Sequence, residues 1–214
     1  MKHLLRVLGF SSICVCTSAA AQGPSAPPSE APPTARLPPG TMTSSEHTDA
    51  WKIANALAAA PTAIAENATV RDWPLPNGRV LRQGTNGWTC LPDLPGRPQH
   101  DPMCLDETSL KWMTAVMSHQ APHADRVGLS YMLLGEARAD PDDITATKPP
   151  PGKNWSYTGP HVMVVLPDSS RDALSGVNRD ITKDEPYVTA VQAPSPLWII
   201  PVARGGELLR VYRP

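Results

Sequence analysis

The chain has 214 residues, and its 19 basic and 20 acidic side chains give a formal net charge of −1 at pH 7. The basic residues form no cluster or stripe, which argues against a partner bound through the phosphate backbone of a nucleic acid. The length suits one domain of ordinary size together with shorter segments outside its core.

Residues 1–21 have the pattern of a bacterial signal peptide. Lys2 and Arg6 form a positive start, residues 7–16 form an apolar run, and three alanines at 19–21 offer small side chains for cleavage. The apolar run is shorter than the roughly 20 residues that a membrane-spanning helix needs, so an uncleaved anchor is the weaker alternative. We expect cleavage after Ala21, no membrane span after processing, and export to the periplasm or the medium.

Residues 22–42 have the composition of a disordered tether. They contain seven prolines and few apolar side chains. Such a segment cannot bury enough apolar surface to offset the entropy lost on ordering. We therefore expect a tether over residues 22–42 and a single domain over residues 43–214.

The first part of that domain has one helical and several extended patterns. Thr48 or Asp49 can cap a helix over residues 50–57, in which Ile53 and Leu57 share one face. Short β-branched or aromatic runs, separated by Pro, Asn and Gly, then predict strands. These runs are residues 69–73, 79–82 and 88–91, the first two as a hairpin.

The second part contains the clearest amphipathic helix. It follows a cap at Asp106, places Leu110, Met113 and Met117 at helical spacing, and ends before Pro122. Apolar runs at residues 127–134, 161–166, 187–191 and 197–202 predict further strands, and we expect a short helix that starts at Asp168 or Ser169 and reaches Leu174. Helices early and strands late predict an α+β fold, with a mostly antiparallel sheet and two or three helices packed on one face.

Cys90 and Cys104 are the two cysteines that remain after cleavage of the signal peptide. The loop between them contains four prolines and a glycine, so it cannot build regular structure of its own. An exported chain folds in an oxidising compartment, where such a pair forms a disulfide. We expect one disulfide, between Cys90 and Cys104.

Four stretches of the sequence, residues 52–57, 84–90, 101–106 and 158–163, resemble a family of exported bacterial proteins of uncharacterised activity. The second ends in Asn-Gly-Trp-Thr-Cys and the third reads Asp-Pro-Met-Cys-Leu-Asp. The resemblance covers most of residues 50–202. It implies a single exported domain with the paired cysteines, and it implies no substrate or catalytic residue.

Metal binding has little support in the sequence. His119 and His123 have the i, i+4 spacing of a helical zinc pair, and His161 or the loop pair His100 and Asp101 would have to complete it. A proline at 122 disfavours helix at the residue before it, so the two imidazoles should not share a helical face. We expect neither a metal nor another cofactor.

A catalytic alternative is built on Cys104 and His161. Cys104 lies just before the helix capped by Asp106, where the helix dipole would lower the pKa of a thiol, and His161 opens a later strand. This layout resembles cell-wall amidases of the papain-like kind, although their motif around the cysteine is absent. A disulfide at Cys104 would remove the nucleophile.

Four residues stand out as binding candidates, namely His161, Trp88, His100 and Asp101. An aromatic face suits a concave apolar site, and His161 at a strand start can face a cleft. The sequence favours a non-catalytic binding or scaffolding domain of the cell envelope, whose partner is an envelope component or a small ligand. The small Cys-His hydrolase stays open as the alternative, and the sequence leaves the oligomeric state undetermined.

Overall fold

The computed structural model describes residues 47–140, 143–181, 185–190 and 192–202. All of them belong to the unit Leu37–Pro214. The expected signal peptide and tether lie outside the described residues. Within the described part of the chain, no helix has the length and apolar character needed to cross a bilayer.

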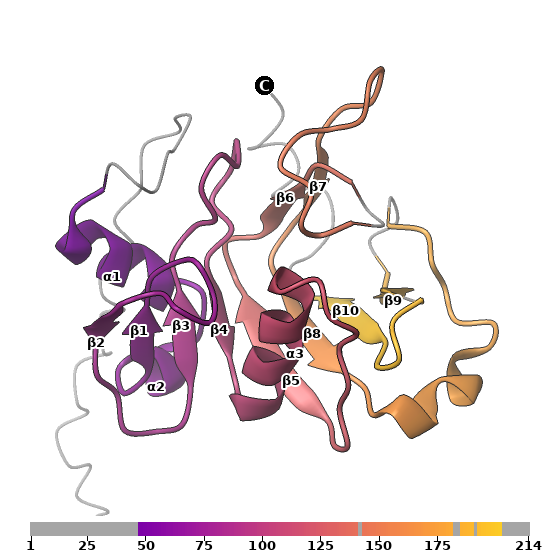
Figure 1. Ribbon diagram of the computed structural model, residues 1–214, viewed down its shortest axis with the longest axis horizontal. Coiled ribbons are helices and arrows are strands. Elements are labelled where there is room, and N and C mark those ends of the chain that lie inside the picture. The colour runs from indigo at the N-terminus through magenta and orange to yellow at the C-terminus, as the bar shows by residue number, and fades with distance from the viewer. Residues whose placement is uncertain (1–46, 141–142, 182–184, 191, 203–214) are drawn as a thin grey trace, which may run out of the picture. The chain divides into compact units, whose positions relative to one another are not determined.

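An eight-stranded sheet forms the centre of the fold, in the order β2-β1-β3-β4-β5-β8-β10-β9 (Figure 1). Its pairs are antiparallel except for β1 with β3. A separate pair, β6 and β7, is also antiparallel. The strands are β1 Thr69–Arg71, β2 Val80–Arg82, β3 Thr89–Leu91, β4 Met103–Leu105, β5 Gly128–Met132, β6 Glu136–Arg138, β7 Ser156–Thr158, β8 His161–Val165, β9 Tyr187–Thr189 and β10 Leu197–Pro201.

The two longer helices begin at the caps that the sequence predicts. In α1, Asp49–Leu57, the Thr48 hydroxyl accepts a hydrogen bond from the amide of Trp51. In α3, Glu107–Met117, the Asp106 carboxylate accepts one from the amide of Ser109 at 2.7 Å. The shorter helical segments are α2 Thr62–Ala65, η2 Asp168–Ser170 and η3 Asp172–Leu174. The α+β fold and the mostly antiparallel sheet are thus confirmed.

The helices lie on both faces of the sheet, where the sequence led us to expect one. Cys104 and Leu105 are neighbours in β4, so their side chains point to opposite faces. Cys104 packs with Ala56 of α1, whose carbonyl oxygen lies 3.6 Å from the Cys104 sulfur. Leu105 packs with Trp112 of α3. The amphipathic pattern of each helix predicts that it packs on the sheet, but it does not predict which face of the sheet the helix covers.

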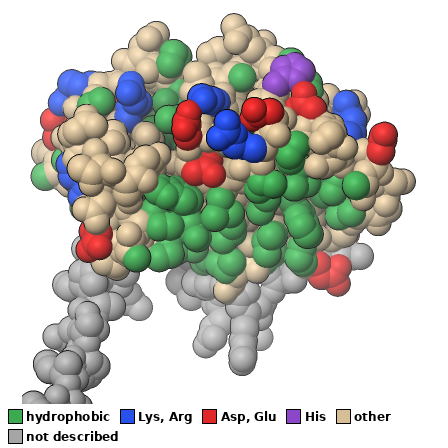
Figure 2. Space-filling model, turned by 90° about the horizontal axis from the view of Figure 1, so that it is seen from below, with side chains coloured by type: hydrophobic (Ala, Val, Ile, Leu, Met, Phe, Trp, Pro, Cys, Tyr) green, Lys and Arg blue, Asp and Glu red, His purple; other side chains and the backbone are tan. Residues whose placement is uncertain are grey.

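The sheet is apolar on both faces. Strand register places Leu129, Val164 and Trp198 in one row across β5, β8 and β10, on the face away from α3. In the view from below, hydrophobic side chains form a continuous area next to a band of charged ones (Figure 2). This two-sided character explains why the buried side chains fall into two clusters, one on each face of β4.

Candidate functional site

A loop over residues 92–102 joins β3 to β4 and forms one wall of the candidate site. Cys90 and Cys104 are register partners in these two strands, and a disulfide joins them at the base of the loop. The expected disulfide is therefore confirmed. It closes the loop covalently next to the point where its two ends are already paired by backbone hydrogen bonds.

Asp93 is the polar anchor of this loop. Its Oδ1 accepts hydrogen bonds from Asn55 Nδ2 at 3.0 Å and from the amide of Asp101 at 2.9 Å. Its Oδ2 lies 2.6 Å from His100 Nδ1. Asp93 and Asn55 are both fully buried, so these bonds replace water on groups that would be costly to leave unpaired. The loop is fixed against α1 as a result.

Glu136, Arg138 and His161 form a second buried group, on β6 and at the start of β8. Arg138 Nε donates to Glu136 Oε1 at 2.8 Å, and His161 Nε2 lies 3.8 Å from the same oxygen. Burial raises the pKa of Glu136, but the positive charge of Arg138 outweighs it, and the pKa lies below its ordinary value. Burial lowers the pKa of His161. We infer a charged Glu136–Arg138 pair beside a neutral imidazole.

Arg97 lies in the loop and is held by three contacts. Its Nη2 donates to the carbonyl of Ile144 at 2.9 Å, its Nε is 3.7 Å from Asp101 Oδ2, and its guanidinium lies 5.5 Å from the ring centre of Trp155. Only 5 % of the side chain is exposed. Its Nη1 is buried and has no hydrogen-bond partner among the described residues.

Asp101 lies between the two groups. Its Oδ1 accepts a hydrogen bond from the amide of Leu94 at 2.8 Å. Burial, together with the negative charge of Asp93, holds the pKa of Asp101 well above its ordinary value. A protonated Asp101 has a hydroxyl to donate, because its other oxygen is already used as an acceptor.

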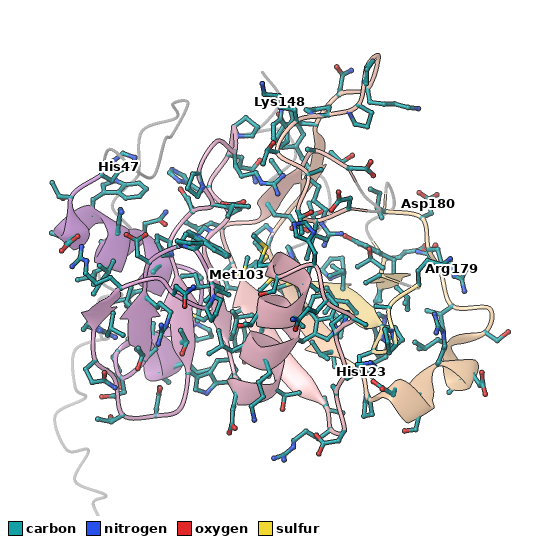
Figure 3. The ribbon with its side chains drawn as sticks, viewed as in Figure 1. His47, Met103, His123, Lys148, Arg179 and Asp180 are labelled. Carbon is teal, nitrogen blue, oxygen red and sulfur yellow. A yellow bond between two sulfur atoms is a disulfide. The ribbon has the colours of Figure 1, made fainter. Side chains whose placement is uncertain are left out.

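A cavity of about 40 Å³ lies between this cluster and α3. Four polar side chains line it, those of Arg97, Asp101, Glu136 and Arg138. Five of the seven methionines of the chain also line it, namely Met103, Met113, Met117, Met132 and Met163. Met103 lies beside α3 in Figure 3, at the start of β4. The cavity therefore has charged side chains at one end and flexible methionine side chains along its wall.

A larger hollow of about 570 Å³ is open to solvent next to α3. Charged side chains line it, and they pair with one another: Lys111 with Glu107, Arg126 with Asp125, and His123 with Asp168. None of the charged side chains that line this hollow is both buried and short of a partner, as Arg97 is. The smaller cavity is the better candidate for a binding site.

The binding candidates from the sequence divide between the two faces of the sheet. Asp101 and His161 both border Glu136, which interacts electrostatically with each of them. His100 bonds the Asp93 carboxylate, which also accepts a hydrogen bond from the amide of Asp101. Trp88 packs on the opposite face, with its ring 5.6 Å from that of Tyr131. Three of the four candidates thus belong to one polar cluster.

The structure does not bring Cys104 and His161 together. Cys104 pairs with Tyr131 across β4 and β5, while His161 pairs with Met132, the next residue of β5. Their side chains therefore point to opposite faces of the sheet. The Cys104 sulfur is also bonded to Cys90.

His119 and His123 both lie beyond the end of α3, and His119 has a φ of 55°, so the two imidazoles do not share a helical face. His123 bonds Asp168 at 2.6 Å. Over the described ranges of the chain, no group of three or more His, Cys, Asp and Glu side chains has the arrangement of a metal site.

The sequence does not single out Arg97, Glu136 or Arg138. Glu136 and Arg138 alternate with two alanines, which is a strand pattern with charges at every second position. Both faces of β6 are buried, so these charges point inward. Charges enclosed by a disulfide loop, or alternating with alanine in a short strand, are the signals that would have indicated this cluster.

Comparison with known proteins gives no relative, because no family model, no curated protein and no solved structure matches the chain. Its function has to follow from the geometry of the site.

Proposed function

We propose that this chain is an exported binding domain of a bacterial cell envelope, which holds a small ligand in the methionine-lined cavity without transforming it. Arg97 carries the proposal. Its guanidinium is buried and fixed on three sides, yet Nη1 has no acceptor within the part of the chain that the structure describes. A buried donor without a partner is rare in folded proteins and calls for an acceptor from outside the chain.

Export is supported by the signal-peptide pattern of residues 1–21, by the four stretches that resemble exported bacterial proteins, and by the disulfide. The alternative, a hydrolase that uses Cys104 and His161, has less support. It would need the Cys104 sulfur as a free thiolate on the same face of the sheet as the imidazole.

The test is expression of the full chain in a Gram-negative bacterial host, followed by cell fractionation and purification without reductant. Mass spectrometry should find the envelope fraction beginning at Gln22 with both remaining cysteines oxidised. Under native conditions a fraction of the protein should carry a small molecule that is released on denaturation. Recovery from the cytosol with Met1 attached and free thiols would refute export. An envelope protein that carries no small molecule and binds none of those added to it would refute the binding role.

A further inference from the structure

We propose that the cavity binds a short-chain monocarboxylate, with the carboxylate on Arg97 and a small aliphatic body against the methionines. This inference rests on the proposed binding function and names its ligand class. Three features support it: the unpaired Nη1 of Arg97, the charged side chains of the lining, and the size of the cavity.

The neighbours of Arg97 hold the guanidinium group that carries the unpaired Nη1 in one position. Trp155 stacks near the guanidinium of Arg97, and Ile144 and Asp101 engage its Nη2 and Nε sides, so the side chain loses little further freedom when Nη1 binds an acceptor. Guanidinium groups form their strongest hydrogen bonds with anionic oxygens. A carboxylate oxygen on Nη1 would pair a buried donor that has no acceptor among the described residues.

Asp101 supplies a second donor at the same end of the cavity. Burial and the charge of Asp93 favour its protonated form, and its Oδ1 already accepts from the backbone. The polar lining contains two positive groups, Arg97 and Arg138, and the carboxylate of Glu136 pairs with Arg138. Arg97 is therefore the positive group that a ligand with a single negative charge would pair.

The size of the cavity limits the ligand. One water needs about 10 to 15 Å³ of such space, so about 40 Å³ holds roughly three or four non-hydrogen atoms. Acetate has this size, and propionate is slightly larger. Methionine side chains are flexible and adjust to small changes in shape, and their walls favour a methyl or ethyl group over a polar one.

The first experiment uses the oxidised wild-type protein and the sodium salts of formate, acetate, propionate, butyrate and hexanoate at constant ionic strength and pH. Binding is followed by calorimetry and by the ε-methyl signals of ¹³C-labelled methionine. We expect saturable binding that is tightest for acetate or propionate, with shifts of the cavity methionines. Acetamide, which has the same shape without the charge, and sodium chloride should produce neither effect.

Arg97→Gln should weaken acetate binding roughly tenfold to a hundredfold, the range for one hydrogen bond between charged groups. Arg126→Gln, which changes an exposed arginine in the open hollow, is the matched control and should bind as the wild type does. If Arg97→Gln does not fold, the methionine signals of the wild-type protein still decide the question.

Three outcomes would overturn the inference. Unshifted methionine signals would mean that the cavity holds only water, an equal response to chloride would mean a general anion site, and affinity that rises steadily to hexanoate would place binding on an apolar surface elsewhere. If the protein purified from the envelope carries another kind of molecule and binds no carboxylate, the ligand class is wrong while the binding function stands. If it carries nothing and binds nothing, both fail.

Discussion

Asn55 of α1 and Asp93 of the disulfide-closed loop exchange two hydrogen bonds. Asn55 Nδ2 donates to Asp93 Oδ1 at 3.0 Å, and the amide of Asp93 donates to Asn55 Oδ1 at 2.8 Å. Both residues are fully buried. The pair ties the loop to a helix residue 38 positions earlier in the chain, and Arg97 lies in the same loop, four residues after Asp93.

Asn55→Ala should therefore destabilise the fold more than an ordinary surface change. It leaves a buried amide and a buried carboxylate oxygen each short of one partner, and we expect the free energy of unfolding to fall by roughly 2 to 4 kcal/mol. Chemical denaturation measures this. Asn154→Ala, at an exposed position, is the control and should change stability little. Equal stability of the two variants would show that the Asn55–Asp93 pair is not an anchor.

Removal of the disulfide should loosen the same loop. Cys90 and Cys104 are 14 positions apart, and closing a loop of this length stabilises a fold by about 3 kcal/mol in the chain-entropy account. The double variant Cys90→Ala, Cys104→Ala should lose about this much, and hydrogen exchange should rise first in residues 92–102. Denaturation of the wild-type protein with and without reductant gives an independent measure. An unchanged midpoint after reduction would contradict the prediction.

The elements with a local signal were predictable from the sequence. Thr48 and Asp106 cap helices because their side-chain oxygens reach the free amides of the first turn, which depends only on nearby residues. Strands β4, β6 and β7 were not expected. The residues of β4 (Met-Cys-Leu) and β6 (Glu-Ala-Arg) include no β-branched or aromatic side chain, so no strand pattern is visible there. Strand β4 is held in place by pairing with β3 and β5 on either side.

The candidate site was predictable only in part. Cys90 and Cys104 could be paired because residue type, the expected compartment and loop composition all agree. Asp101 and His161 could be named as polar residues, but their common neighbour Glu136 lies on a strand that the sequence does not mark. The role of Arg97 depends on burial by residues such as Trp155, which is 58 positions away in the sequence. No local sequence pattern indicates such a contact.

Asp101 should make the stability of the protein fall as the pH rises. Its pKa in the folded state lies well above its ordinary value, so the folded protein binds this proton more tightly than the unfolded chain does. Stability from this group is complete below about pH 4 and is lost as the pH rises towards the folded pKa. Asp93, Arg97 and Glu136 face Asp101, and their charges contribute to this balance.

Asp101→Asn keeps an acceptor for the amide of Leu94 and cannot ionise. We expect the fall in unfolding free energy above about pH 4 to be smaller in this variant than in the wild-type protein. Denaturation curves between roughly pH 4 and 8 measure it. If the pH profiles of the wild-type protein and the variant run parallel, Asp101 is ionised in the folded state. The cavity then has no second donor at this position.

Asp168 should have the opposite pH dependence. A hydrogen bond from His123, with further bonds from the Ser195 hydroxyl and the amide of Ala124, lowers the pKa of Asp168 to about 2. The carboxylate therefore stabilises the fold above its unfolded pKa near 4, and this stabilisation is lost as the pH falls from about 4 to about 2. These bonds join the start of η2 to the segments before β5 and β10.

Asp168→Asn should lower stability at neutral pH, with a difference from the wild-type protein that shrinks as the pH falls through this range. Asp172→Asn, at an exposed position in η3, is the control and should leave the profile unchanged. The Asp168 carboxyl signal in a ¹³C titration gives the pKa directly, and His123→Gln should raise it because the largest contribution is lost. A carboxyl signal that titrates near pH 4 in the wild-type protein would show that the His123–Asp168 bond does not hold the segment together in solution.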